Sequence, residues 1–483
     1  MRSGLRWSFG TQLGLRALSF VSGIVIFRLL DPADFGIYAL ALAVSNVMLC
    51  LNDLGQETAI VAWGRAGGPD GEGDDEDVGS TATTFAIVSS LVLYLVCWVL
   101  APLIAESAGR PSGAGVIRLV TGVVVIDGII TVPRGLLFRA MHQRQVSVTE
   151  LTAVPTTIAV SVALAVVWPG PWGPAIGTFV GAIVNAIATL YYAPDIPAPG
   201  FVSSHARRLL AFGVPGAGTT TLDMVLLNVD SFIVANHLGV EALAFYALAF
   251  NISSWPSTII TTSVRKVSVA AINQLIRLGG DWRGSFGRSL WMLIALLVPI
   301  CLLLALLAQP LVELLYSAKS LPAAPILVWL VVLGGLRVVY GFVVDLLMAH
   351  GRTVATFRAQ LIWLLAALPA MWIGADLDGA RGVAMGHVVA AVVVAGPIYT
   401  YDAWRVGIDL GTVARRLVRP TLGAVASIGV AAVLLPRLAG PGAQLVVGGV
   451  AISVSYAFVG LGPAQLRTFA AMVRRPRRLV SAL

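Results

Sequence analysis

Residues 289–308, SLWMLIALLVPICLLLALLA, run for twenty positions without a charged side chain. A bilayer core of about 30 Å needs about 20 predominantly apolar residues in a helix that crosses it. Membrane β-strands are about ten residues long and alternate in polarity, so a continuous run of this length indicates a helix. A helix also bonds every backbone polar group within its own segment, as lipid requires. The stretch therefore predicts a transmembrane helix.

The same kind of apolar run recurs along the whole chain. Hydrophobic residues make up 58% of the sequence and charged residues only 12%, against about 25% charged in a soluble domain. The predicted fold class is all-α, a polytopic membrane protein with 14 transmembrane helices. The predicted spans lie at residues 8–30, 36–62, 81–104, 116–138, 147–168, 173–193, 208–236, 242–263, 288–314, 323–347, 355–374, 380–402, 418–436 and 443–463.

The basic residues predict the orientation of these spans. With the N-terminus in the cytoplasm, 24 of the 32 Lys and Arg residues lie in or near cytoplasmic segments. Arg16 and Arg337 lie deep within spans. Cytoplasmic loops carry an excess of Lys and Arg, so we expect both termini in the cytoplasm. The six basic residues near the outer side are Arg28, Arg110, Arg118, Lys319, Arg381 and Arg437.

The distribution of charge also bears on partners and source. The pI near 9.7 follows from this loop asymmetry, so no nucleic-acid partner is predicted. Arginine outnumbers lysine 30 to 2, which is typical of GC-rich coding and favours the cytoplasmic membrane of a bacterium. The basic tail at 474–478 fits the cytoplasmic side, where it is solvated or touches anionic lipid.

An internal repeat organises the spans. At an offset of 208 positions, Leu30, Tyr38 and Leu40 recur as Leu238, Tyr246 and Leu248, and Ala39, Ala41 and Ser45 also recur. Each copy is predicted to join two spans through a very short outer turn. Two six-helix lobes in parallel repeat place a pseudo-two-fold axis along the membrane normal, with a cavity between the lobes. The predicted parts are an N-terminal lobe at 1–193, a cytoplasmic linker at 194–207, a C-terminal lobe at 208–402, and two further helices with a basic tail at 403–483.

Three short motifs resemble the polysaccharide-transporter (Wzx-type flippase) family. Residues 28–40, RLLDPADFGIYAL, are similar to its first inter-helix turn, and residues 54–59, LGQETA, to the end of its second helix. Residues 210–215, LAFGVP, with Asn228 and Asp230, are similar to its seventh helix. The resemblance covers essentially the whole chain. It implies a flippase for lipid-linked oligosaccharides that works by alternating access between two lobes.

Polar side chains inside the spans predict a wet cavity. An ionisable residue at mid-membrane costs about 2.5–3.5 kcal/mol on insertion scales and normally faces a bundle interior or water. The predicted substrate-binding residues are Arg16, Gln12, Asn46, Asp53, Asn251, Trp255 and Arg337. The predicted gate or coupling residues are Asp127, Arg134, Asp223, Asp230 and Asp345.

Structural roles compete with these functional ones. Asp127 and Arg134 are spaced to form an ion pair, and Asp230 can pair with an arginine to hold its lobe together. Arg16 can pair with Asp53 or Glu57. Three other features have structural explanations: the glycines Gly173, Gly177 and Gly181 suit close helix packing, the buried thiols Cys50, Cys97 and Cys301 lack metal-ligand spacing, and the acidic loop at 70–77 lacks the spacing of a calcium-binding loop.

Three classes of function are open at this stage. A flippase for a polyprenyl-diphosphate-linked glycan fits deep arginines, which bind diphosphate through charge-assisted hydrogen bonds. A multidrug exporter for cations fits the carboxylates instead. A membrane-embedded glycan polymerase fits least, because the outer loops are too short for a catalytic platform. No cofactor is predicted; Na⁺, H⁺ or membrane potential would supply the energy. Membrane lipids, a glycan polymerase and glycosyltransferases are the further predicted partners.

Overall fold

The computed structural model describes the chain except residues 1, 54–59, 61–74, 141, 194–196, 261–268, 270, 271, 273, 277, 279 and 462–483. At 2–13, 75–78, 208–217 and 258–260 it describes the backbone only. Every regular element in the described part is a helix, which confirms the predicted all-α class. Most of the acidic loop at 70–77 and the whole basic tail at 474–478 lie outside the described residues.

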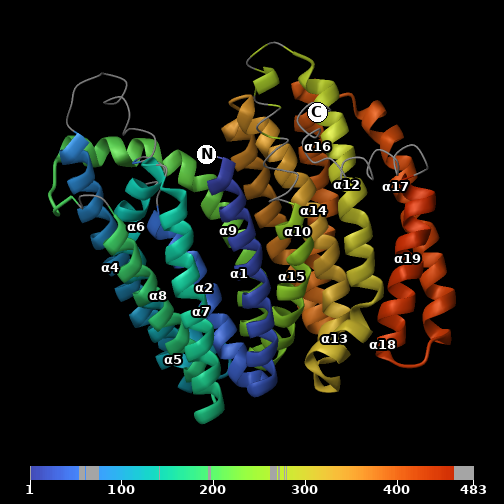
Figure 1. Cartoon of the computed structure of the whole chain (residues 1–483), viewed down its shortest axis with the longest axis horizontal. Coiled ribbons are helices and arrows are strands. Elements are labelled where there is room, and N and C mark those ends of the chain that lie inside the picture. Colours follow the sequence, from blue (N-terminus) through green and yellow to red (C-terminus); the bar gives the residue numbers. More distant parts are fainter. Residues whose placement is uncertain are drawn as a thin grey trace. The chain divides into compact units, whose positions relative to one another are not determined.

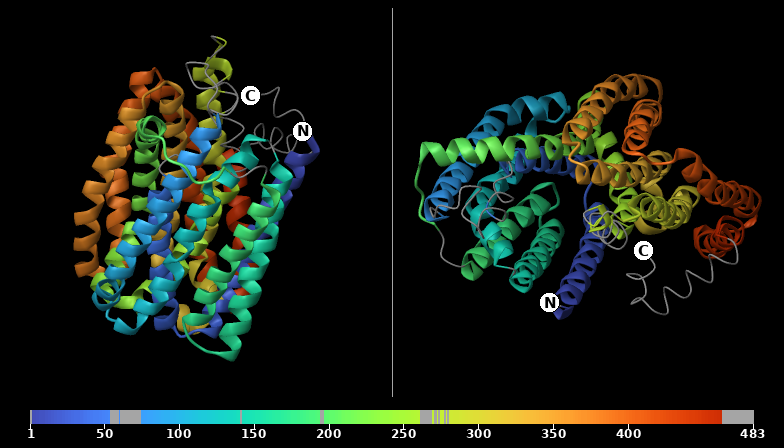
Figure 2. Two further views of the ribbon diagram at one scale, coloured as in Figure 1. Left: turned by 90° about the vertical axis from the view of Figure 1, so that its left-hand side faces the viewer. Right: turned by 90° about the horizontal axis from the view of Figure 1, so that it is seen from above.

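Contacts divide the chain into two compact units, Met1–Ala244 and Phe245–Leu483. Within each unit the long helices run alongside one another (Figures 1 and 2). The first unit holds α1 (Arg2–Leu29), α2 (Pro32–Asp53), α4 (Asp75–Ser107), η1 (Pro111–Gly113), α5 (Ala114–Thr121), α6 (Val123–Arg139), α7 (Gln143–Val167), α8 (Trp172–Tyr192) and most of α9 (Ser203–Ser253). The predicted boundaries of the lobes stay predictions.

The second unit is also built from long helices. It begins within the last residues of α9. Its elements are α10 (Trp255–Ile260), α12 (Trp282–Leu306), α13 (Ala308–Tyr316), η3 (Ala318–Ser320), α14 (Ala323–Ala349), α15 (Thr353–Ala390), the π-helix η4 (Ala391–Ala395), α16 (Gly396–Val406), α17 (Leu410–Leu434), η5 (Leu435–Arg437), α18 (Pro441–Ala443), the π-helix η6 (Gln444–Gly448), α19 (Gly449–Tyr456) and the π-helix η7 (Ala457–Leu461).

Eleven helical stretches of the described chain are long and apolar enough to cross a membrane. One of them, Thr353–Val406, has 54 residues and contains a break in helical geometry at Asp378 and Gly379. Its two arms fold back on each other, because Gly374 packs on the carbonyl of Gly382, and Gly386 on that of Ala370. Two helices therefore share this stretch, and the total of fourteen spans stays a prediction.

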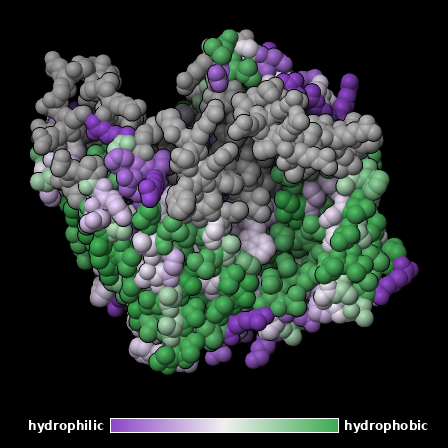
Figure 3. Space-filling model, viewed as in Figure 1, coloured by the Kyte–Doolittle hydropathy of each residue, from purple (hydrophilic) through white to green (hydrophobic). Residues whose placement is uncertain are grey.

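Exposed apolar side chains mark the surface that meets lipid. In α4, Val92, Leu95 and Val99 are exposed in a helix of mean hydropathy 2.4. On the face drawn in Figure 3, hydrophobic residues cover the middle of the helices and hydrophilic ones gather towards their ends. Soluble monomers rarely expose apolar patches of such extent, so the chain is a multi-pass membrane protein.

Both copies of the repeated segment interrupt helical geometry at the corresponding position. The first copy makes the turn between α1 and α2 around Asp31. The second copy bends α9 at Gly239, 208 positions later, where φ is +85°. Glycine adopts positive φ without steric cost. The prediction that each copy makes a short turn is therefore confirmed.

The ninth predicted span differs from the helix observed. It was placed at 288–314, but α12 begins at Trp282 and ends at Leu306, with α13 following as a separate helix. Asp281 caps α12, since its carboxylate accepts the N–H of Gly284. Hydropathy alone does not detect this start, because Arg283 and Arg288 lower the mean hydropathy of the first two turns of the helix.

Close packing of α7 and α8 depends on glycine, as predicted. A Cβ on Gly177 would lie 2.8 Å from the carbonyl oxygen of Thr157 and 2.7 Å from the backbone nitrogen of Ser161. Gly173 approaches the backbone nitrogen of Ala165, and Gly181 packs on the side chain of Thr157. Small residues spaced by four let membrane helices approach closely.

We expect Gly177→Ala to destabilise the first unit by about 1–3 kcal/mol, the usual cost of overpacking. The backbone atoms of α7 that meet the new methyl group cannot rotate away. The measurement is the thermal unfolding of purified protein in detergent. Gly429→Ala in α17 is the control, since a Cβ there meets nothing within 4 Å and alanine favours a helix by about 1 kcal/mol. Equal melting temperatures for both variants would contradict the prediction.

Candidate functional site

Three predicted polar residues of the first unit lie at similar depth. Arg16 lies fourteen residues before the turn that follows α1, and Asn46 lies fourteen residues after α2 begins. Asp223 lies sixteen residues before the break in α9 at Gly239. At 1.5 Å per residue these separations are about 21–24 Å. All three side chains are exposed although they belong to apolar helices.

Helices α2 and α9 touch at two levels within the first unit. Near the turns, Gly36 packs directly on the carbonyl group of Val240. Further along, the thiol of Cys50 lies 3.9 Å from the hydroxyl oxygen of Thr221. Because the first contact pairs an early residue of α2 with a late residue of α9, the two helices run in opposite directions.

Two carboxylates flank the second of these contacts. Asp53 follows Cys50 by about one helical turn, and Asp223 follows Thr221 by two residues. Both lie within electrostatic range of the Cys50 thiol. The structure therefore brings Asp53 of α2 and Asp223 of α9 to the same part of the first unit, and their predicted roles, substrate binding for Asp53 and gating or coupling for Asp223, stay predictions.

Arg16 forms no hydrogen bond or ion pair with any residue that the structure describes. A pair between Arg16 and Asp53 is therefore not part of this structure. The side chains of Gln12 and Glu57 lie outside the described residues. An accessible guanidinium group inside an apolar helix is available for an anionic ligand, because its planar donors match phosphate oxygens.

The other predicted residues of the first unit have structural contacts. Arg134 donates to Asp127 across 2.9 Å in α6, so the predicted ion pair is present. Asp230 is completely buried, and one carboxylate oxygen accepts the N–H of Ser231 at 2.8 Å. Both contacts lie within a single helix, and the predicted gate or coupling roles stay predictions.

In the second unit, Arg337 lies against an aromatic cluster. Its guanidinium carbon stands 5.7 Å from the ring centre of Trp363, a cation–π arrangement. The Trp363 ring in turn meets the edges of Tyr340 and of the fully buried His387. The Nη2 atom of Arg337 is buried and has no hydrogen-bond partner among the described residues.

The remaining predicted residues of the second unit lie around α14. Asn251 is exposed near the end of α9, and Trp255 is half-buried at the start of α10. The backbone of Ser253 packs on Gly334, about one turn before Arg337. Asp345 is half-buried two turns after Arg337. Asn251, Trp255 and Arg337 therefore lie in the same part of the second unit, and their predicted role in substrate binding stays a prediction.

Sequence reasoning missed the aromatic partners of Arg337. Trp363 is absent from the residues that the sequence singles out, and in the structure it is only 3% exposed. Tyr340 was not singled out, although it lies three residues from Arg337 on the same face of α14. That spacing is the signal that was available. Trp363 belongs to another helix, so nothing in the sequence around Arg337 indicates the contact between the two.

The chain matches a family model described as polysaccharide biosynthesis protein over residues 25–325. This match covers more than half of the 483 residues. The chain belongs to this family. The predicted resemblance to polysaccharide transporters of the Wzx type is thereby confirmed.

Curated relatives agree with the family. The lipopolysaccharide biosynthesis protein WzxC of Escherichia coli (strain K12) is 23% identical over 402 residues, covering 81% of this chain and 78% of WzxC. The succinoglycan biosynthesis transport protein ExoT of Rhizobium meliloti (strain 1021) is 25% identical over 387 residues, covering 78% of this chain and 75% of ExoT.

Solved structures share the fold at low sequence identity. The lipid II flippase MurJ, in an inward closed conformation, has a TM-score of 0.79 at 13% identity, covering 97% of this chain and 100% of that one. An inward-facing multidrug resistance transporter of the MATE family has a TM-score of 0.64 at 14% identity, covering 81% and 94%. The family model thus shows a polysaccharide biosynthesis protein, and the solved structures show that it shares its fold with MurJ and the MATE transporter.

We expect Arg337→Met to leave thermal stability nearly unchanged. The cation–π contact contributes about 2 kcal/mol when desolvated, and this roughly offsets the cost of burying the charge. Trp363→Ala should lower stability by about 3–5 kcal/mol, since it opens a large cavity. Thermal unfolding in detergent compares the two. A loss for Arg337→Met as large as that for Trp363→Ala would show that the ion, and not the ring, holds this cluster together.

Proposed function

We propose that the chain moves a polyprenyl-diphosphate-linked oligosaccharide from the cytoplasmic to the outer leaflet of a bacterial cytoplasmic membrane. The observation that carries the proposal is the exposed guanidinium group of Arg16, placed about 21 Å along α1 from its turn. A charge at this depth is costly in lipid. An anionic head group that binds there would compensate it through charge-assisted hydrogen bonds.

The family and its named relatives support the glycan part of the substrate. WzxC is named for lipopolysaccharide biosynthesis and ExoT for succinoglycan transport. In our proposal, Gln12, Asn46 and Asp53 act with Arg16 on the first unit, whereas Asn251, Trp255 and Arg337 accept sugars or phosphate on the second. Glycosyltransferases would supply the carried lipid, and a glycan polymerase would consume it.

The proposed mechanism is alternating access by two six-helix lobes, followed in the chain by two further helices, with both termini in the cytoplasm. The matched turns at Asp31 and Gly239 support the parallel repeat on which it depends. The two arms of Thr353–Val406 support two spans in that stretch, as the count of fourteen requires. Close packing of Gly36 on Val240 would seal the outer side while substrate enters from the cytoplasm.

We expect Arg16→Ala to lower flipping about tenfold or more, the loss expected for one charge-assisted hydrogen bond. Arg16→Lys should retain a fraction, because lysine keeps the charge but lacks the planar fork. The assay follows a fluorescent polyprenyl-diphosphate oligosaccharide in reconstituted vesicles. Arg144→Ala, which removes an exposed arginine at the start of α7, controls for net charge.

Full flipping by a well-folded Arg16→Ala protein would exclude the head-group role. Transport of an organic cation in the same vesicles, with no movement of the lipid, would favour the multidrug exporter. Asp53 and Asp223 would then be the substrate ligands, since carboxylates attract cations. A parallel fall in melting temperature and flipping would assign Arg16 a structural role.

Energy coupling is a separate part of the proposal. A diphosphate that leaves a negative interior gains about 2.3 kcal/mol per charge per 100 mV, so the membrane potential favours export. Na⁺ or H⁺ would add to this drive through Asp230, whose burial excludes water from its carboxylate. Asp127, Arg134, Asp223 and Asp345 are the remaining candidates for gating or coupling.

We expect Asp230→Asn to abolish the dependence of flipping on Na⁺ or pH, because the amide cannot bind a cation through charge. Glu241→Gln is the matched control: it removes an exposed carboxylate from the same helix and should keep that dependence. Flipping rates are measured in vesicles with imposed sodium, proton or potassium-diffusion gradients. Unaltered ion dependence in Asp230→Asn would exclude this coupling site.

A further inference from the structure

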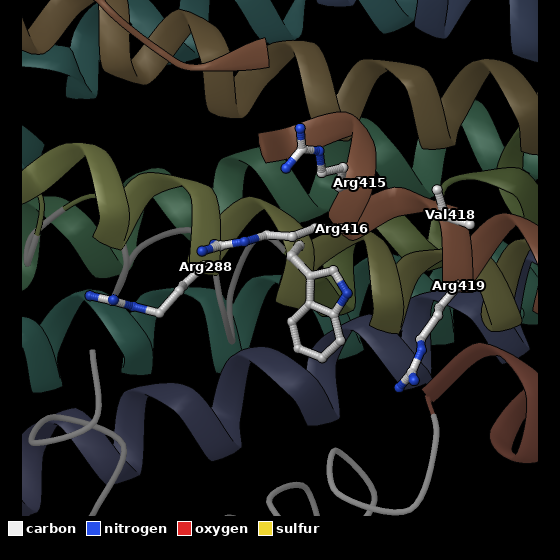
Figure 4. Close-up of a pocket in the computed structure, with 6 residues that line it drawn as sticks. Arg288, Arg415, Arg416, Val418 and Arg419 are labelled. Atoms are coloured by element: carbon white, nitrogen blue, oxygen red, sulfur yellow. The ribbon is translucent and has the colours of Figure 1, made fainter. Parts of the chain in front are cut away.

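Four arginines gather in the second unit where α12 meets α17. They line a pocket with a cavity volume of about 530 Å³. Figure 4 shows Arg288 and Arg419 at opposite ends of this pocket, with Arg416 between them. Arg416 lies against α12, since its Nη1 is 3.3 Å from the position of a Cβ on Gly287. The full lining is Arg288, Trp291, Arg415, Arg416, Val418 and Arg419.

The positive charge of this pocket is not balanced by the described residues. None of its four arginines forms an ion pair with a described carboxylate. Arg288 donates to a neutral partner, the hydroxyl of Ser285, at 3.0 Å. Like charges one turn apart on a helix repel each other, and Arg415 and Arg419 are so placed. A bound anion would relieve this repulsion.

The carboxylate nearest in sequence is engaged elsewhere. Asp409 caps the start of α17, where it accepts the hydroxyl and the N–H of Thr412 and the N–H of Gly411. These hydrogen bonds, led by the Thr412 hydroxyl, lower the pKa of Asp409, and attraction to Arg415 is the smallest contribution. Asp409 therefore stabilises the helix start and leaves the pocket electropositive.

The surface beside the arginines is apolar and faces outwards. Along α17, the side chains that follow the arginines on its exposed face are Val418, Leu422, Val425, Ile428 and Val433. Arg415 precedes Val418 by three residues and so begins the same stripe. Trp291 adds an aromatic side chain of the kind enriched where lipid meets water. A ligand with an anionic head and apolar chains matches this surface better than a soluble anion does.

We propose that this pocket binds the head group of a resident anionic phospholipid with two phosphodiester groups, of the diphosphatidylglycerol type. Each phosphodiester exposes two free oxygens, which one arginine fork can engage, so four arginines provide two forks for each of two phosphates. Arginines spread along the pocket suit separated phosphates better than a diphosphate joined through one oxygen. Basic pockets between helices on the cytoplasmic side bind such lipids in other membrane proteins.

Native mass spectrometry of the purified full-length protein tests this proposal independently of flipping. Diphosphatidylglycerol, phosphatidylglycerol and phosphatidylcholine are titrated separately. We expect binding to weaken in that order. The double variant Arg415→Gln/Arg419→Gln should weaken diphosphatidylglycerol binding about tenfold or more. Arg405→Gln/Arg437→Gln, which removes two exposed arginines of the same unit outside the pocket, should change it less than about twofold.

A third variant separates the effect of charge from that of side-chain geometry, and it controls for misfolding. Arg415→Lys/Arg419→Lys keeps both charges and should bind with intermediate affinity, at an unchanged melting temperature. Equal losses in the pocket variant and its control would overturn the proposal. So would displacement of the phospholipid by inorganic pyrophosphate, which would indicate a soluble ligand. Binding of polyprenyl diphosphate as tight as that of diphosphatidylglycerol would instead assign the pocket to the carried lipid and equally overturn the proposal.

Discussion

Backbone hydrogen bonding in a medium without water governs this structure. Each apolar segment must satisfy its own N–H and C=O groups, so it becomes a helix. Lipid removes the hydrophobic drive between helices, and packing must hold them together. Glycine supplies that packing where backbones meet, in α8 through Gly177 and in α15 through Gly374 and Gly386. The breaks at Gly239 and at Asp378–Gly379 occur where one helix must end and the next begin.

The same constraint sorts the polar side chains into two groups. Several that are buried have hydrogen-bond partners: Asn52 accepts the hydroxyl of Ser89 at 2.9 Å, and Asp230 accepts the N–H of Ser231. Others are exposed within apolar helices, as Arg16 and Asn46 are. A buried polar group without a hydrogen bond is costly, so the first group stabilises the fold. The second group is available to exchange water for a ligand.

The sequence predicts the local features of the fold well, and the contacts between helices distant in the chain only partly. Helical class, the short turns of the repeat and the glycine contact between α7 and α8 follow from patterns within one or two neighbouring segments. The contact of Arg337 with Trp363 depends on the rotation of α14 against α15, which hydropathy does not specify. The arginine pocket depends on α12 meeting α17, more than 100 residues later, and the charge rule assigned its arginines only to the cytoplasmic side.

Arg16 and Arg337 show why depth in a span does not define a role. Both are arginines well inside apolar helices, and sequence alone treats them as equivalent. Arg337 is held over the Trp363 ring, and its Nη2 atom is buried without a hydrogen-bond partner among the described residues. Arg16 is exposed and makes no described contact, so an anion that reaches it gains the full interaction. The environment of each guanidinium group, and not its position along the helix, therefore separates the two: Arg16 is the primary ligand for the head group in our proposal, and Arg337 would add to binding from a side chain already fixed against Trp363.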